Sequence, residues 1–233
     1  MWSKLTNNNL SILTYVLITP LRFRKIREML LHRQPDLTVV MDNVNKAHNL
    51  SAILRSCDCI GIGHVHAVSY RKYIHAKQNN AAAGASKWTA LHLHHDIETL
   101  YKTLADDGMQ ILVATNREGC VDFRDIDYTR PTALVVGAEW DGISEEAIKG
   151  ADHAVSIPML GMVESLNVSA ATAIILFEAQ RQRENKGMYR NLQLEQECFE
   201  RLLFEASYPR LSRELKEEGS PYPKLDEEGN IIF

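Results

Sequence analysis

The chain has 233 residues, of which 45% are hydrophobic and 24% are charged, and its formal net charge is −4. These fractions are typical of a soluble globular protein rather than a disordered one, and the length suits one domain with or without additions at its ends. The negative charge argues against a protein that coats nucleic acid by bulk charge alone, although a local basic patch can still bind RNA.

The N-terminal segment shows no sign of a membrane anchor. Residues 10–21 are mainly apolar, but a span needs about 20 apolar residues, and no clear cleavage site indicates a signal peptide. We therefore expect no membrane contact. Residues 1–18 are predicted to be an extra, disordered segment, and residues 20–32 an amphipathic basic helix with Phe23, Ile26 and Leu30 on its apolar side.

The rest of the chain alternates between short apolar runs and helical patterns. The predicted strands are residues 37–41, 65–68, 89–93, 110–115, 132–136 and 155–157. The predicted helices are residues 49–59, 97–105, 144–149, 194–205 and 209–218, with the longest starting near residue 167. Residues 79–86 are rich in small side chains and are predicted to be either a tightly packed helix or a loop over a ligand. Alternation at this spacing predicts βα units and a parallel sheet.

Histidines and cysteines do not indicate a metal site. His92 and His94 alternate on a predicted strand, and no cysteine or carboxylate cluster accompanies them at ligand spacing, so an exposed edge strand explains them better than zinc. The four cysteines show no C-x-x-C spacing and are predicted to be free thiols in a reducing cytoplasm; they are Cys57, Cys59, Cys120 and Cys198.

Residues 155–179 form the most informative stretch. A short β-branched run stops at Pro158, and helical spacing begins near Asn167. Ser165 or Asn167 can cap this helix, because a short side-chain oxygen accepts from the free N–H groups of the first turn. Loops at the carboxyl ends of parallel strands often line ligand sites, but an ordinary βα junction would look the same.

Two other stretches carry candidate site residues. Gly137 and Gly142 flank a turn after a predicted strand, and the pattern is not that of a dinucleotide site. Glu139 in this turn is either solvated or part of a site. Asn49 is predicted to cap its helix, and Arg55 lies one and a half turns further on, where a surface role is the usual one.

Basic residues cluster in two places. One cluster comprises Arg22, Arg24, Lys25, Arg27 and Arg33. The other comprises Arg181, Arg183, Lys186 and Arg190. Each cluster could be a solvated helix face or a surface that holds phosphates.

Three motifs, in order, closely resemble those of the SpoU-type RNA 2′-O-ribose methyltransferases, a branch of the SPOUT superfamily. They are NLSAILR at residues 49–55, LVVGAEWDGIS at 134–144 and IPMLGMVESLNVSAA at 157–171. The flanks, including residues 24–44 and the PYP of residues 221–223, are similar to the members that act on tRNA. Three motifs in order with similar flanks make the resemblance specific.

The resemblance implies a SPOUT α/β fold: a parallel sheet flanked by helices, with a deep trefoil knot in its C-terminal part. It implies a basic N-terminal helix at residues 19–36, a catalytic domain at 37–187 and a helical extension at 188–233. It also implies a cytoplasmic homodimer that needs no metal and transfers a methyl group from S-adenosylmethionine to the ribose 2′-hydroxyl of a D-loop guanosine in tRNA.

The resemblance assigns roles residue by residue. It implies a catalytic set of Asn49, Arg55, Glu139, Ser165 and Asn167. It implies a cofactor pocket lined by Thr115, Gly137, Ile157, Met159 and Leu166. The basic ends would hold tRNA phosphates through Arg22, Arg24, Lys25, Arg27, Arg33, Arg181 and Arg183.

Two alternatives stay open from the sequence. One is the same chemistry at another tRNA position or on ribosomal RNA, although related rRNA enzymes carry a separate substrate-binding domain for which residues before Asn49 leave no room. The other is a catalytically inactive RNA-binding dimer on the same fold, against which the intact motifs speak.

Overall fold

A computed structural model describes residues 18–69, 88–138 and 142–232. These residues form two compact units, which are considered separately: residues 32–193, and residues 18–31 together with 194–232. Of the segment expected to be disordered, residues 1–17 lie outside the described residues, as does the small-residue stretch 79–86, whereas Ile18 is described and buried. In the described part of the chain, no helix has the length and apolar character needed to cross a bilayer.

A seven-stranded sheet forms the centre of the larger unit, in the order β3-β2-β1-β6-β4-β7-β5. Its strands are β1 (Leu37–Asp42), β2 (His64–Val68), β3 (Ala90–His94), β4 (Gln110–Ala114), β5 (Val121–Asp122), β6 (Thr132–Gly137) and β7 (His153–Ser156). Every neighbouring pair is parallel. The α/β fold with a parallel sheet is therefore confirmed, and the trefoil knot stays a prediction.

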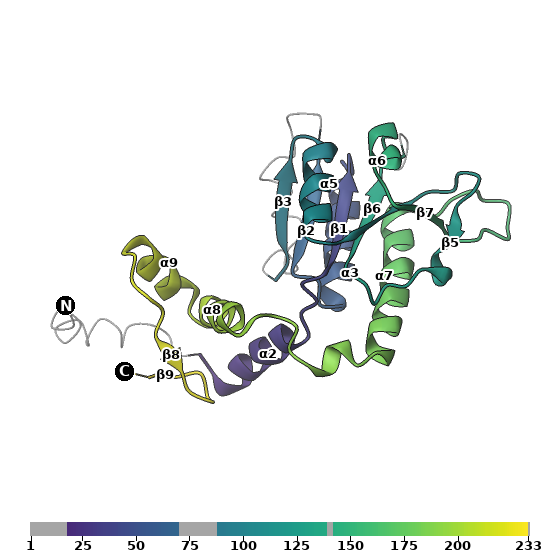
Figure 1. Cartoon of the computed structure of the whole chain (residues 1–233). Helices are drawn as coiled ribbons and strands as arrows, with labels where there is room; N and C mark the ends of the chain where they lie inside the picture. The colour runs from purple at the N-terminus through teal and green to yellow at the C-terminus, as the bar shows by residue number, and fades with distance from the viewer. Residues whose placement is uncertain (1–17, 70–87, 139–141, 233) are drawn as a thin grey trace. The chain divides into compact units, whose positions relative to one another are not determined.

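Helices cover both faces of this sheet (Figure 1). They are α3 (Ala47–Cys59) and α7 (Val168–Asn185) on one face, and α5 (Ile97–Asp106) and α6 (Glu145–Lys149) on the other, with short 3₁₀ turns η3 (Phe123–Asp125) and η4 (Met188–Arg190). The strands β1 and β6 are buried along their whole length, as expected for parallel strands that pack against helices on both sides.

Local details differ from the sequence predictions where packing decides them. Asn49 lies inside α3 and is buried, and Lys46 is the N-cap residue, so the prediction that Asn49 caps the helix is wrong. The strand predicted at residues 155–157 spans His153–Ser156. The two-residue edge strand β5 has no sequence signal, because it is too short for period-two alternation to appear.

A buried arginine joins the end of α7 to the amino-terminal ends of the central strands. Arg183 is fully buried, and its guanidinium donates to Gln34 Oε1 at 3.0 Å and to Asp36 Oδ1 at 2.5 Å. It also donates to the backbone oxygens of Tyr128, Asp36 and Arg130. The planar fork of arginine suits such a multi-acceptor site, and the prediction that Arg183 holds tRNA phosphates is wrong because its side chain is enclosed.

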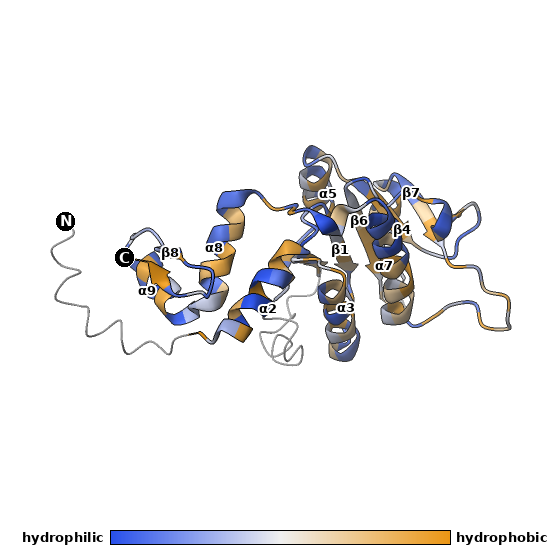
Figure 2. Ribbon diagram, turned by 90° about the horizontal axis from the view of Figure 1, so that it is seen from below, coloured by the Kyte–Doolittle hydropathy of each residue, from blue (hydrophilic) through white to orange (hydrophobic). Residues whose placement is uncertain are grey.

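The smaller unit comprises the helices α2 (Pro20–Leu31), α8 (Gln196–Ser207) and α9 (Pro209–Glu217) and the hairpin β8 (Lys224–Leu225) and β9 (Ile231–Ile232). Phe23 of α2 packs on Gly229, where a Cβ atom would lie 2.5 Å from the ring, and Tyr208 donates to Gly229 O at 2.7 Å. Figure 2 shows hydrophobic and hydrophilic residues alternating along α2; its buried residues are Phe23, Ile26 and Leu30, and α2 lies against α8. The two terminal segments thus share one small core.

Four imidazoles form a ladder across β2 and the edge strand β3. His64 and His92 have ring nitrogens 2.9 Å apart, as do His66 and His94. The ring centroids of successive members are 5.1 to 5.3 Å apart. Burial and the neighbouring imidazoles lower the pKa of His66 to about 4. The edge-strand interpretation of His92 and His94 is confirmed.

We expect Arg183→Met to lower the free energy of unfolding by about 3–5 kcal/mol, because it leaves buried acceptors without a donor. Arg181→Met is the matched control, since Arg181 is exposed and bonds to Glu178. It should change stability by less than about 0.5 kcal/mol. Chemical denaturation measures both, and equal effects would contradict a structural role for the buried guanidinium.

The His66 pKa predicts a loss of stability on mild acidification. Unfolded His66 takes up a proton near pH 6.5, whereas folded His66 does so only near pH 4, so stability falls as the pH falls between these values. His66→Gln should flatten this part of the profile of unfolding free energy against pH. The exposed His153 on β7 serves as control, and a variant curve parallel to that of the unaltered chain would refute the prediction.

Candidate functional site

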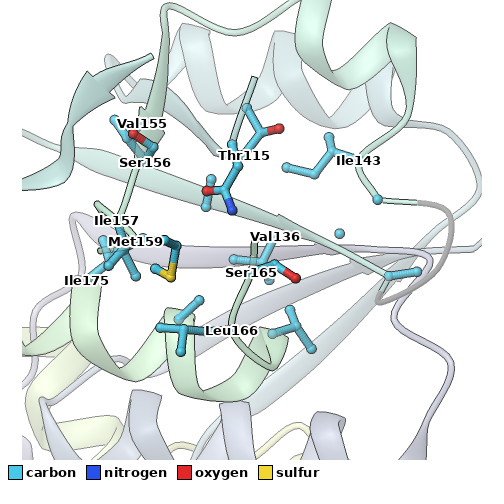
Figure 3. A pocket seen from close by; sticks show the side chains of 17 residues that line it. Thr115, Val136, Ile143, Val155, Ser156, Ile157, Met159, Ser165, Leu166 and Ile175 are labelled. Atoms are coloured by element: carbon cyan, nitrogen blue, oxygen red, sulfur yellow. The ribbon is translucent and has the colours of Figure 1, made fainter. Parts of the chain in front are cut away.

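A cavity of about 230 Å³ opens at the carboxyl ends of β4, β6 and β7 and against the first turns of α7. It contains all the residues predicted to line a cofactor pocket, namely Thr115, Gly137, Ile157, Met159 and Leu166, and also Ser165. Figure 3 shows Thr115, from the loop after β4, and Met159 and Ser165, from the segment between β7 and α7, around one space. Parallel strands place their carboxyl ends at one edge, so residues far apart in sequence meet there.

Backbone crowding explains the glycine after β6. A Cβ atom on Gly137 would lie 2.2 Å from Gly142 O, so only glycine fits. Ala138 N donates to Gly142 O at 2.9 Å and Gly142 N donates to Ala138 O at 3.0 Å, which closes the stem of a tight turn. The predicted site residue Glu139 lies outside the described residues.

Hydrogen bonds connect the loops that surround the cavity. Thr115 N donates to Val155 O at 2.9 Å, and the Asn116 side chain donates to Glu164 O. The Arg117 guanidinium bonds to the Glu145 carboxylate and lowers its pKa. That ion pair is exposed and contributes little to stability, but the first two bonds fix the spacing of the loops.

The start of α7 brings two predicted catalytic residues together. Asn167 caps the helix by accepting from Ser169 N at 2.9 Å, and its Nδ2 donates to Asn49 Oδ1 at 3.2 Å. The predicted cap at Asn167 is therefore confirmed. The same contact explains why Asn49 is buried inside α3, where it faces α7 rather than the backbone of its own first turn.

Arg55 lies elsewhere in this chain. It is exposed on α3 and lines a separate, shallow hollow with Ala47, His48, Ser51 and Ala52. No residue of that hollow lines the cavity. His48 and Arg55 lie seven residues apart, a spacing that places both on one helix face. The predicted helix began at residue 49, so His48 fell outside it and the shared face was missed.

The sequence analysis also missed part of the cavity wall. Asn116, Val136, Ile143, Ala171 and Ile175 line it, and their positions next to the predicted residues were the available signal. Among the described residues, no group of three or more potential metal ligands is close enough to hold a metal ion.

The predicted phosphate-binding residues divide by exposure. Arg22, Arg24, Lys25 and Arg27 are exposed on α2, and Arg181 is exposed on α7. Arg33 is buried and donates to Ile62 O at 2.9 Å, to Trp88 O and to Asp58, so the prediction of a phosphate contact is wrong for Arg33 as it is for Arg183. Burial and nearby backbone acceptors give both side chains structural partners instead.

Family models match almost the whole region described above. The model for the SpoU rRNA Methylase family matches residues 36–177, and the model for the C-terminal part of SpoU rRNA methylases matches residues 181–233. The chain belongs to the SpoU methylase family. The resemblance read from the three motifs is thereby confirmed.

Individual relatives show which members of the family this chain resembles. The chain is 47% identical over 216 residues to the tRNA (guanosine(18)-2′-O)-methyltransferase of Escherichia coli K12, covering 92% of this chain and 94% of the relative. The crystal structure of the Aquifex aeolicus TrmH/SpoU tRNA modifying enzyme matches with a TM-score of 0.76 and 40% identity, covering 81% of this chain and 95% of that one.

A third relative was solved with a cofactor. The SpoU methyltransferase AviRb from Streptomyces viridochromogenes, in complex with AdoMet, matches with a TM-score of 0.58 and 27% identity. The match covers 65% of this chain and 62% of that one.

Proposed function

We propose that this protein methylates the ribose 2′-hydroxyl of guanosine 18 in the D-loop of tRNA, using S-adenosylmethionine. The observation that carries the proposal is the cavity lined by the second and third SpoU motif regions, in a chain that matches a guanosine-18 enzyme over 92% of its length. The helical terminal unit, with its exposed basic residues on α2, is consistent with a tRNA substrate.

The cavity fits S-adenosylmethionine by its chemistry. Apolar side chains and the free backbone groups at strand ends suit a flat, polar-edged base, and the glycine at position 137 lets the backbone approach closely. Thr115, Gly137, Ile157, Met159 and Leu166 would hold the cofactor. When bound, it supplies a methyl group that is already electrophilic on its sulfonium sulfur, and the protein's task is to align the hydroxyl and help remove its proton.

The catalytic assignments extend from this geometry. Asn49 and Asn167 form a rigid pair beside the cavity, and Ser165 faces into it. Glu139 would complete the catalytic set. Arg55 would clamp the RNA phosphate or stabilise the developing alkoxide, because a guanidinium stays charged in proteins and is poorly suited to act as a base.

A homodimer would reconcile the position of Arg55 with this role. Apolar side chains stand exposed along the loop after β7 and the outer face of α7, among them Leu160 and Met162, which are 100% exposed, and Phe177, which is 52% exposed. Figure 2 shows this loop largely in the hydrophobic colour. A second copy would cover these side chains and bring its own Arg55 toward the cavity. We also infer a cytoplasmic location, where tRNA is found.

A methyl-transfer assay tests the proposal directly. Unmodified tRNA transcript and isotopically labelled S-adenosylmethionine should give one 2′-O-methylguanosine at position 18, located by mass spectrometry. Methylation at another tRNA position or on ribosomal RNA fragments would support the alternative substrate. Tight tRNA binding without methyl transfer would support an inactive RNA-binding dimer.

Gly137→Ala should abolish measurable binding of S-adenosylhomocysteine, because the added Cβ atom would force the Gly142 backbone out of the cavity wall. Gly161→Ala, in the loop after β7, is the control, since its Cβ atom would meet nothing within 4 Å. Calorimetry gives both affinities. Equal affinity in the two variants would remove Gly137 from the cofactor pocket.

Arg55→Ala should keep cofactor binding and the dimer but lower turnover by about two orders of magnitude, the size seen when one transition-state donor is lost. Arg55→Lys should restore little, because an ammonium retains charge and loses the fork. Single-turnover kinetics on tRNA provide the measurement. Near-normal turnover in Arg55→Ala would shift attention to Glu139.

A further inference from the structure

Asp42 is a fully buried carboxylate at the carboxyl end of the central strand β1. Its Oδ2 accepts a hydrogen bond from Ser144 N at 2.7 Å, and its Oδ1 accepts from Asn43 Nδ2 at 3.1 Å. Within the described ranges, Asp42 takes part in no ion pair. A buried charge without a cation is costly, so these two neutral donors are the groups that stabilise it.

The two donors belong to different segments of the site. Ser144 is the N-cap residue of α6 and directly follows Gly142 and Ile143, which line the cavity. Asn43 begins the segment that leads to α3 and Asn49, and it adopts the left-handed conformation with φ of 55°, which asparagine tolerates better than most residues. One carboxylate therefore joins the segments that hold the first and second motifs.

The Ser144 bond has a geometric consequence for the cavity. Asp42 and Gly137 are paired in register on β1 and β6, and the chain leaves β6 at Gly137 and returns at Gly142 through the bridge with Ala138. By accepting the hydrogen bond from Ser144 N, Asp42 fixes the position of the segment from Gly142 to Ser144. A charged acceptor makes the shorter and stronger bond needed for such an anchor.

We propose that Asp42 is a positioning residue for methyl transfer, whose carboxylate holds the segment from Gly142 to Ser144 against the cofactor and ties it to the start of the segment that carries Asn49. The proposal rests on the proposed function, since the methyl donor is what the turn would contact. Asp42 itself lines neither the cavity nor the hollow beside Arg55.

Asp42→Asn is the decisive variant, because it keeps the side-chain volume but loses the charge and one acceptor. We expect the dissociation constant for S-adenosylhomocysteine and the KM for S-adenosylmethionine to rise about tenfold, as a charge-assisted bond becomes an ordinary one. The KM for tRNA should stay within about twofold. Calorimetry of the full chain and steady-state kinetics give these values, and Asp42→Ala should show a larger rise in the same constants.

Asp152→Asn is the matched control. Asp152 Oδ2 accepts from Ile111 N, also at 2.7 Å, but at the amino-terminal ends of β4 and β7, on the opposite edge of the sheet from the cavity. This variant should leave both cofactor constants unchanged. Asp152 is exposed, so this variant tests the loss of a carboxylate–backbone bond away from the cavity and not the loss of a buried carboxylate. Cofactor affinity lost in Asp42→Asn and kept in Asp152→Asn would support positioning by Asp42.

Two results would overturn the inference. One is an S-adenosylhomocysteine affinity in folded Asp42→Asn within twofold of the unaltered chain. The other is an equal rise in the KM of cofactor and of tRNA, which would indicate general disorder. If the unaltered chain binds S-adenosylhomocysteine but methylates no tRNA, the proposed function fails. The role of Asp42 is then still tested, because the effect of Asp42→Asn on S-adenosylhomocysteine affinity does not depend on methyl transfer.

Discussion

The site depends on the parallel pairing of β6 with β1 and β4 in the middle of the sheet. The register runs from Leu37 with Thr132 to Asp42 with Gly137, without a bulge. Because both strands end at the same level, the turn after β6 is held directly beside the end of β1. The neighbouring β4 and β7 end at the same edge, so the loops that follow them meet the first turns of α7 around one cavity.

This arrangement depends on one steric feature and one polar feature. The backbone at Gly137 approaches Gly142 so closely that any side chain would collide. At the opposite ends of the strands, the enclosed guanidinium of Arg183 connects the C-terminal half of α7 with the start of β1 and the segment before β6. The helix α7, whose first turn borders the cavity, is thus held at its other end by charge-assisted hydrogen bonds. Such bonds are stronger than neutral ones, so removing one partner costs more free energy.

Buried polar groups in this protein fall into structural and site-related sets. Arg33 and Arg183 satisfy backbone carbonyls in the interior, so their positive charge is not presented to RNA. Asn49 and Asp42 lie beside the cavity and connect the segments around it. The cations on α2, Arg55 and Arg181 are exposed, so a phosphate can reach them. Burial, rather than residue type, separates these roles.

The sequence by itself determined the class of fold, the family and most of the cavity. Strand and helix periods predict a parallel sheet, and the glycines and caps after β6 and β7 mark the loops that line the cavity, because these are local effects of backbone conformation. Only the tertiary structure decided which cations are available and which residues meet. The local sequence predicts Asn49 as a helix cap, but Asn49 faces Asn167 from within α3. Arg183 belongs to a basic cluster in the sequence, but its side chain is enclosed. Arg55 lies apart from the cavity of its own chain. Such outcomes depend on contacts between residues more than 100 positions apart, which no local pattern records.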